Sequence, residues 1–174
     1  MKIEFLNPFI LAAAEVLEKE VQAKVTRGDV ALRKGMYISN DVTALISLVG
    51  QVEGPVLYGM SYDTAKRLVS QMMDGQPFEH FDELAQSGIA ELANVITGLS
   101  STRLARAGYS SVISVPMLII GKGAHISTLK TGRLMVPLRT QFGVFDLELA
   151  LKENPNASPE FANYAPEVAT MTLG

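Results

Sequence analysis

Segment 143–151 constrains the fold most, because apolar and polar side chains alternate from Phe145 to Leu149. An alternation with a period of two is typical of a β-strand that has one buried face. The residues expected to point one way are Phe145, Leu147, Leu149 and Leu151. Asp146 and Glu148 are expected to point the other way. A sheet that contains this strand needs other elements to cover its apolar face.

Three segments have helical patterns that can provide this cover. The first begins at Asn7-Pro8, with Asn7 as the expected N-cap and Pro8 at the first helical position, and runs to about Gln22. The second is expected to be capped by Ser61 and to end at Asp74-Gly75, and the third covers about residues 82–107 and stops at Gly108. The apolar residues expected to face inward from the first two are Phe9, Ala13, Val16, Leu17, Val21, Ala65, Leu68, Val69 and Met72.

The remaining apolar segments predict strands. These cover residues 42–50, 56–58, 111–120 and 133–139, in addition to 143–151. A turn through Glu53-Gly54-Pro55 is expected to join the first two of them. The order is helix, strands, helix, then helix, strands. We therefore predict an α+β fold with a largely antiparallel sheet, three helices packed on one face, and pseudo-duplicated α-β halves.

The composition changes near residue 152. Residues 1–151 are expected to form one domain with a single core. Residues 152–174 contain Pro155, Pro159 and Pro166, which are three of the eight prolines in the chain. This segment is expected to be a disordered tail, or an arm that packs on a neighbour through Phe161 and Tyr164.

Charge and composition exclude several classes of function. The formal net charge is −3, which gives no basic surface for nucleic acid. The chain has no cysteine, so disulfides, thiol catalysis and cysteine-ligated zinc are excluded. The sequence has no pattern of a signal peptide, and its apolar runs are far shorter than the ~20 residues that span a bilayer. We therefore expect a cytoplasmic protein that does not bind nucleic acid or insert into membranes.

The third helix has an unusual outward face. Its apolar face is expected to contain Ala85, Ile89, Leu92, Ile96 and Leu99. The opposite face is expected to contain Ser87, Glu91, Asn94, Gly98, Ser101 and Ala105. That face has one acid, one amide and otherwise very small side chains, whereas a solvated helix face usually carries many charges. Gly98 destabilises a helix interior by up to about 1 kcal/mol, so close approach of another molecule could explain its presence.

An ordinary solvent-facing position is the alternative for Glu91 and Asn94. They are one turn apart, and such a pair is most often simply exposed to solvent. The same pattern occurs at Glu4 and Asn7, where Asn7 is expected to cap a helix. His80 and His125 have no surrounding metal-ligand spacing, so no metal site is expected.

The spacing on the third helix is similar to a family pattern. Ser87-x3-Glu91-x2-Asn94 is followed after 21 residues by Pro116, within the apolar run 114–121. This arrangement resembles that of the CheC/CheX/FliY chemotaxis phosphatases, and the opening Asn7-Pro8-Phe9-Ile10 is similar to the start of CheX-type members. The resemblance covers about residues 3–151. The first helix has Glu15-x-x-Glu18 where two-centre members carry a second Glu-x-x-Asn, which favours a one-centre, CheX-like member.

The resemblance implies a function in two-component signalling. It implies that the chain hydrolyses the aspartyl phosphate of a CheY-like response regulator, with Asn94 orienting the attacking water and Glu91 pairing with the regulator's lysine. Mg²⁺ would be bound by the phosphorylated receiver domain, and this chain would have no cofactor of its own. Ser87 and Pro116 would be supporting residues, and Gly98 and Ser101 would lie on the partner-docking face.

The resemblance also implies a homodimer that pairs through its sheets. Two other functions are compatible with the same fold. One is a non-catalytic adaptor that binds a receiver, and the other is a structural assembly domain like those of flagellar-switch relatives.

Overall fold

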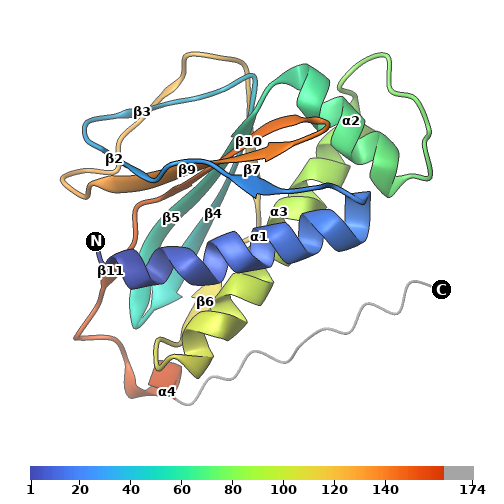
Figure 1. Cartoon of the computed structure of the whole chain (residues 1–174). Coiled ribbons are helices and arrows are strands. Elements are labelled where there is room, and N and C mark those ends of the chain that lie inside the picture. The colour runs from blue at the N-terminus through green and yellow to red at the C-terminus, as the bar shows by residue number, and fades with distance from the viewer. Residues whose placement is uncertain (163–174) are drawn as a thin grey trace.

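The computed structural model describes residues 1–162, which form an α+β fold with helices over one face of a large antiparallel sheet (Figure 1). The helical elements are η1 (Ile3–Phe5), α1 (Leu6–Val21), α2 (Tyr62–Met72), α3 (Glu83–Arg106) and α4 (Pro159–Ala162). The strands of the large sheet are β1 (Thr26–Arg27), β2 (Ala31–Arg33), β4 (Val42–Gly50), β5 (Val52–Met60), β6 (Ser111–Ile113), β7 (Met117–Ile120), β9 (Arg133–Thr140), β10 (Gly143–Leu149) and β11 (Lys152–Glu153). A separate two-stranded sheet pairs β3 (Tyr37–Ile38) with β8 (His125–Ile126). The predicted fold class is confirmed.

Two hairpins form the centre of the sheet. The main order is β1-β9-β10-β5-β4-β6, so hairpin β4–β5 and hairpin β9–β10 meet where β5 pairs with β10. In the register of that pair, Tyr58 lies opposite Leu147. The helix α1 precedes the first hairpin along the chain and α3 precedes the second. The two halves therefore repeat the order of a helix followed by a hairpin.

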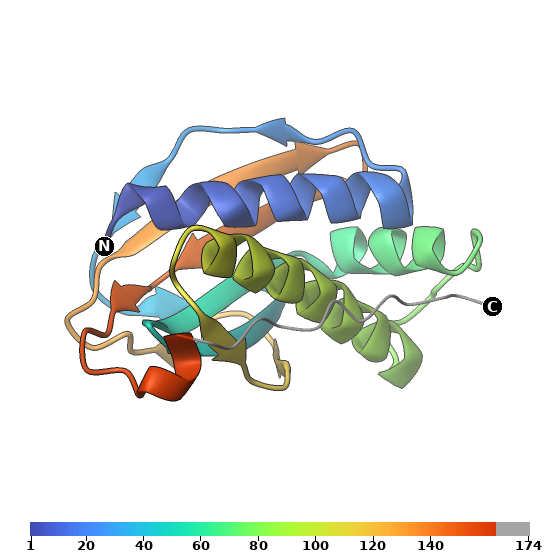
Figure 2. The same ribbon diagram turned by 90° about the horizontal axis from the view of Figure 1, so that it is seen from below.

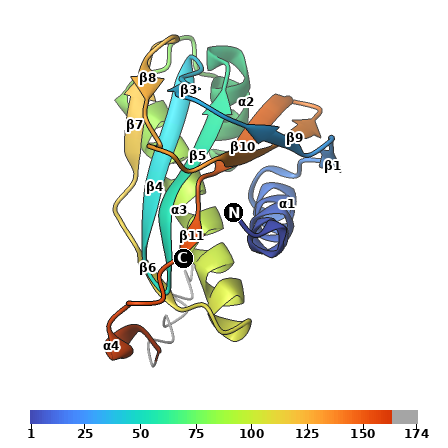
Figure 3. The same cartoon turned by 90° about the vertical axis from the view of Figure 1, so that its left-hand side faces the viewer.

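The core lies between the sheet and α1, α2 and α3. Phe145, Leu147 and Leu149 all face this core and are at most 1% exposed, as the alternation predicted. Figure 2 shows the three helices lying together over the sheet, and Figure 3 shows α1 and α3 on the same side of β4 and β5. Among the residues predicted to face inward from α1 and α2, all are buried except Met72, which is half-buried against the core.

Side chains cap the first turns of α2 and α3, and the cap at Ser61 agrees with the sequence prediction. The Ser61 side chain accepts a hydrogen bond from the backbone N–H of Thr64 at 3.1 Å. Asp82 likewise accepts from the N–H of Ala85 at 2.9 Å, so α3 begins one residue after Asp82. These side chains satisfy N–H groups that have no partner within the first turn of a helix.

Two local predictions are wrong. Asn7 is not an N-cap, because η1 continues directly into α1, which begins at Leu6 with Phe5 as its cap residue. The expected turn at Glu53-Gly54-Pro55 lies within β5, and the hairpin instead turns at Gln51. Gly54 has a φ of +130°, and a Cβ there would collide with the carbonyl oxygen of Ala150. The glycine therefore permits close approach of two backbone segments and does not form a turn.

The predicted strand 111–120 is also interrupted. Both β6 and β7 pair with β4, and residues 114–116 between them leave the ladder. Pro116 consequently lies in this connection and not in a strand, as expected for a residue that has no N–H to donate.

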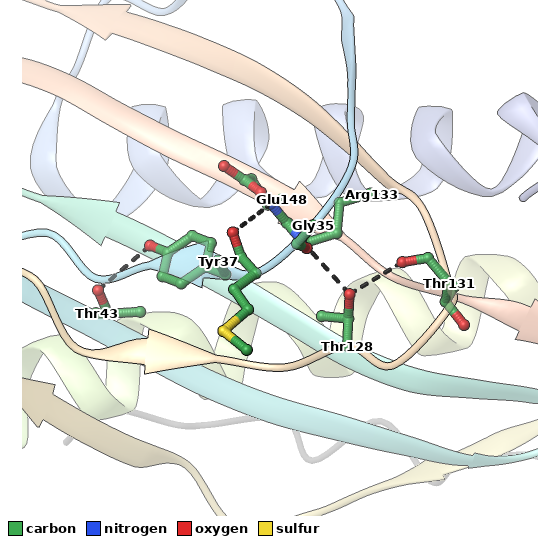
Figure 4. Close-up of polar contacts among 8 residues, drawn as sticks. Gly35, Tyr37, Thr43, Thr128, Thr131, Arg133 and Glu148 are labelled. Atoms are coloured by element: carbon green, nitrogen blue, oxygen red, sulfur yellow. Dashed lines mark hydrogen bonds and ion pairs between the residues drawn. The ribbon is translucent and has the colours of Figure 1, made fainter.

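The sheet face opposite the helices is covered too, which the alternation of segment 143–151 did not predict. Arg133, 4% exposed, forms an ion pair with Glu148 at 2.7 Å and donates to the carbonyl oxygens of Gly35 and Met36 (Figure 4). Its guanidinium also lies 5.9 Å from the ring centre of Tyr37. These contacts hold the segment that contains β3 against the sheet. Glu148, which was expected to face solvent, is therefore paired with a buried arginine.

Beyond Leu151, the described chain continues to contact the domain. Strand β11 pairs with β5, and the Phe161 ring lies beside Gly50 at the end of β4. Tyr164 and Pro166, which belong to the predicted arm, lie outside the described residues.

Two glycines of α3 are expected to respond oppositely to alanine. A Cβ at Gly88 would lie 2.9 Å from a methyl carbon of Val69 on α2, whereas a Cβ at Gly98 would have its nearest neighbour at 4.0 Å. Gly88→Ala should lower the free energy of unfolding by about 1–3 kcal/mol through overpacking. Gly98→Ala should raise it by up to about 1 kcal/mol through helix propensity. Urea denaturation measures both, and equal effects of the two variants would contradict this packing.

Asp146 is expected to make stability depend on pH. Burial raises the pKa of this carboxyl, against the opposing effects of the Asn40 amide and of Arg139 and Arg33. The folded protein then binds a proton at Asp146 more readily than the unfolded chain, so this residue's contribution to stability falls as pH rises from near 4 through the raised pKa. Asp146→Asn should therefore raise stability at pH 7 and flatten this dependence.

Thermal melts from pH 4 to pH 8 test the role of Asp146. Asp29→Asn removes the same charge from an exposed position and serves as the matched control. A lower melting temperature of Asp146→Asn at pH 7, relative to this control, would contradict the destabilising effect of the buried carboxylate.

Candidate functional site

The candidate site lies on the outward face of α3. Helical geometry places Ser87, Glu91, Asn94 and Gly98 within an arc of roughly 60° around the axis. Ser87 and Glu91 are exposed, and Asn94 and Gly98 are half-buried. We call these four residues the α3 stripe. The opposite face contains Ala85, Ile89, Leu92 and Ile96, which are buried as predicted, and Leu99, which is half-buried against the core.

Close packing explains why the stripe faces outward. Gly88, which follows Ser87, is buried against Val69 of α2, so the two helices approach closely at this turn. On the other side of α3, the Thr97 hydroxyl lies 2.7 Å from the Tyr58 hydroxyl of β5. These contacts lie on the two flanks of α3, so among the described residues the α3 stripe stays exposed at Ser87 and Glu91 and half-buried at Asn94 and Gly98.

Glu91 and Asn94 have side chains available for a partner molecule. Neither side chain forms a hydrogen bond or an ion pair with any other residue in the range 1–162. Glu91 is the only charged residue between Leu84 and Thr102. A carboxylate and an amide thus lie on a surface of small side chains, with donors and acceptors that no residue in the range 1–162 satisfies.

Ser101 does not lie on the open face, which corrects the predicted docking surface. It is 3% exposed, and its hydroxyl donates to the carbonyl oxygen of Ser111 at 3.0 Å. Strand β6 therefore covers this end of the small-residue face. Gly98, one turn earlier, still borders the open surface, with Ile113 of β6 beside it.

Pro116 lies in the connection between β6 and β7, which run alongside α3. It is half-buried, next to Val115, which is 85% exposed. Pro116 thus lies between two strands that contact α3 and does not contribute a reactive group.

The site is an open surface. Two surface depressions occur elsewhere, one between α2 and Phe142 and one between Asn40 and Asp146. Neither contains a residue of the α3 stripe. Within residues 1–162, no group of three or more His, Asp or Glu side chains is arranged to hold a metal ion. The α3 stripe is therefore suited to enter a site on another molecule.

Sequence reasoning missed two buried polar networks. The Arg133–Glu148 network covers the outer sheet face, and the Tyr58–Thr97 pair attaches α3 to the sheet. Thr97 gave a usable signal, because it is a polar residue close to the apolar side of a long helix. Its partner is 39 residues away and could not be identified from spacing.

No helix in the described part of the chain is long and apolar enough to cross a bilayer.

Comparison with known proteins links the α3 stripe to a family. Residues 42–139, which include the α3 stripe and Pro116, match the family model described as chemotaxis phosphatase CheX. The chain is 28% identical over 157 residues to the CheY-P phosphatase CheX of Thermotoga maritima, covering 87% of this chain and 98% of that protein.

Solved structures of CheC-like and CheX proteins have a similar fold. A CheC-like superfamily protein from Shewanella has a TM-score of 0.79 at 25% identity, covering 87% of this chain and 99% of that one. A chain of the CheX-CheY-BeF₃-Mg²⁺ complex from Borrelia burgdorferi has a TM-score of 0.72 at 25% identity, covering 87% of this chain and 100% of that chain.

Proposed function

Because this chain belongs to the CheX family of chemotaxis phosphatases, we propose that it hydrolyses the aspartyl phosphate of a CheY-like receiver domain. The observation that carries this proposal is the α3 stripe, where Glu91 and Asn94 project from an open surface without partners among the described residues. The Thermotoga relative is a CheY-P phosphatase, and the Borrelia relative forms a complex with CheY, BeF₃ and Mg²⁺.

The reaction needs little beyond a positioned water. The oxygen of a water attacks phosphorus in line with the bond to the aspartyl oxygen, and that bond breaks. The products are the free aspartate carboxylate and inorganic phosphate, with the remaining proton released to solvent. The acyl phosphate is already activated, so orientation of the water supplies much of the rate acceleration.

Asn94 is suited to hold this water. Its amide oxygen can accept a hydrogen bond from the water, and its NH₂ group can donate to a phosphoryl oxygen. An amide adds no negative charge beside the phosphoryl group, whereas an aspartate would repel it. Asn94→Asp should therefore be as damaging as Asn94→Ala.

Glu91 is suited to docking. It lies one turn before Asn94 and can pair with a lysine of the receiver, which fixes the register of the two proteins. Mg²⁺ belongs to the receiver in this scheme, and the metal's charge is supplied by the partner. Ser87 and Pro116 support the surface, and Gly98 allows the partner's backbone to approach α3 closely.

The catalytic proposal predicts different effects for the two residues. Asn94→Ala should lower the maximal rate of phosphate release from a phosphorylated receiver by about 100-fold, because one positioning group is lost. Glu91→Ala should mainly raise the receiver concentration needed for half-maximal rate. Phosphate release with Mg²⁺ present measures both parameters, with a thermal melt of each variant.

Asn156→Ala is the matched control for Asn94→Ala, because it removes an exposed amide from another surface. A wild-type protein that binds the receiver without increasing phosphate release would contradict catalysis and would support an adaptor. An Asn94→Ala variant as fast as the control would show that the water is held elsewhere.

The protein is proposed to act in the cytoplasm as a homodimer. Residues 1–151 form the proposed phosphatase domain, and the described part of the following segment begins with β11, which pairs with β5. Dimerisation through the sheet is compatible with β7, which pairs with β4 and has no strand on its other side among the described residues. Met117 on this edge is 62% exposed.

Light scattering coupled to gel filtration tests the dimer. The expected mass is twice the 18.8 kDa of one chain. Met117→Lys should shift the protein toward the monomer, because it places a charge on the proposed edge. A wild-type protein that elutes as a monomer at all concentrations tested would contradict the proposed assembly.

A further inference from the structure

A chain of buried hydroxyl groups connects the middle of the sheet to the helical turn that carries Asn94. The Tyr58 hydroxyl of β5 lies 2.7 Å from Thr97 Oγ1, and Thr97 donates to the carbonyl oxygen of Ala93 at 2.7 Å. The Thr97 hydrogen is used in the second bond, so the Tyr58 hydroxyl must be the donor in the first. The donors therefore all point in one direction, from Tyr58 through Thr97 to Ala93. We call these two consecutive hydrogen bonds the Tyr58 relay.

The Tyr58 relay starts from a rigid position. Tyr58 pairs with Ala44 of β4 on one side and with Leu147 of β10 on the other. Its ring centre lies 5.6 Å from that of Phe145, and both Tyr58 and Thr97 are 0% exposed. Burial raises the pKa of the Tyr58 hydroxyl, so it remains protonated and keeps its role as donor.

The Tyr58 relay ends beside Asn94. Ala93 directly precedes Asn94, and Thr97 follows it by three residues, about 60° further around the helix. Ser100 and Thr102 also donate to the carbonyl oxygen four residues before them, but neither reaches a strand. Among the described residues, the turn of α3 that carries Asn94 is thus linked to the central sheet by a side-chain hydrogen bond, while those neighbouring threonine and serine bonds are internal to the helix.

We propose that Tyr58 and Thr97 are positioning residues for catalysis, which fix the rotation of α3 so that Asn94 meets the attacking water at the required angle. The inference rests on the proposed function. Apolar contacts alone hold a helix on a sheet but resist small rotations weakly, because they have no direction. A hydrogen bond has a preferred direction and length, so it restricts such rotation.

The two residues of the site should differ in sensitivity to rotation of α3. A charge pair between Glu91 and a lysine weakens gradually with distance, and both side chains are long enough to adjust. An in-line attack tolerates much less displacement, and a misplacement of about 1 Å can slow a reaction about 100-fold. Loss of the Tyr58 relay should therefore lower kcat and leave KM for the phosphorylated receiver nearly unchanged.

Steady-state phosphate release from a phosphorylated receiver tests this proposal in the full chain. Thr97→Val removes the hydroxyl with little change in shape and should lower kcat about tenfold, with KM changed by less than about twofold. Thr97→Ser restores the hydroxyl and should restore kcat. Tyr58→Phe should lower kcat, and the double variant should be no slower than Thr97→Val because both changes break one relay.

Thr102→Val is the matched control, since it removes the same kind of internal helix bond further along α3 without affecting the sheet. Its kcat should stay within about twofold of wild type. Thr97→Val with wild-type kcat, or an equal loss in Thr102→Val, would overturn the positioning role while leaving the phosphatase activity intact. A rise in KM with unchanged kcat would also overturn it. A wild-type protein without activity would instead overturn the proposed function, and this inference with it.

If Thr97→Val fails to fold, Tyr58→Phe tests the proposal instead, because it removes only the hydroxyl oxygen and keeps the packed ring. A folded Tyr58→Phe variant, verified by its thermal melt, with wild-type kcat and KM would overturn the proposal.

Discussion

The pairing of β5 with β10 is the interaction on which the rest of the structure depends. It joins two hairpins into one sheet, so the apolar residues of both halves form one continuous surface that α1, α2 and α3 cover together. Because α3 must bury one face against this surface, its opposite face is directed outward. The position of Glu91 and Asn94 is therefore a consequence of how the two halves share a core. Within residues 1–162, the side of α3 on which Glu91 and Asn94 have no hydrogen-bond or ion-pair partner is opposite the most strongly buried side of the helix.

The other broad face of the sheet is covered by a segment that polar contacts hold in place. Arg133 and Glu148 form a buried ion pair there, and the arginine also holds the carbonyl oxygens of Gly35 and Met36. Such a pair contributes little net stability relative to apolar packing, but it requires specific partners and so favours one arrangement of the covering segment. Polar interactions have the same role in α3. The Tyr58–Thr97 hydrogen bond and the hydrogen bond from Ser101 to β6 favour one orientation of this helix on the sheet. The fold is thus stabilised by apolar burial and oriented by a few buried polar contacts.

Local patterns in the sequence predicted much of the fold and the outward face of α3. Strand β4, the alternation of β10, the Ser61 cap, the start of α3 near Asp82 and the apolar face of α3 all depend on residues near one another in sequence. Gly54 and Pro116 were misplaced because their roles depend on the approach of Ala150 and on pairing with β4. Ser101 was placed outside because β6 covers it only after the chain turns back at Gly108. The outward position of Glu91 and Asn94 was predictable from helical periodicity, whereas the Tyr58 and Arg133 contacts join residues 39 and 98 positions apart.

In the proposed function, a receiver binds the α3 stripe and completes a catalytic centre to which this chain contributes Glu91 and Asn94. Amide chemical shifts of the isotope-labelled protein, measured while it is titrated with a beryllofluoride-activated, Mg²⁺-loaded receiver, test this binding mode most directly. We expect the largest shifts at Ser87, Glu91, Asn94 and Gly98 and in the neighbouring connection that contains Pro116. Shifts concentrated instead on the opposite side of the sheet, at Met36 and Ile38, would contradict it.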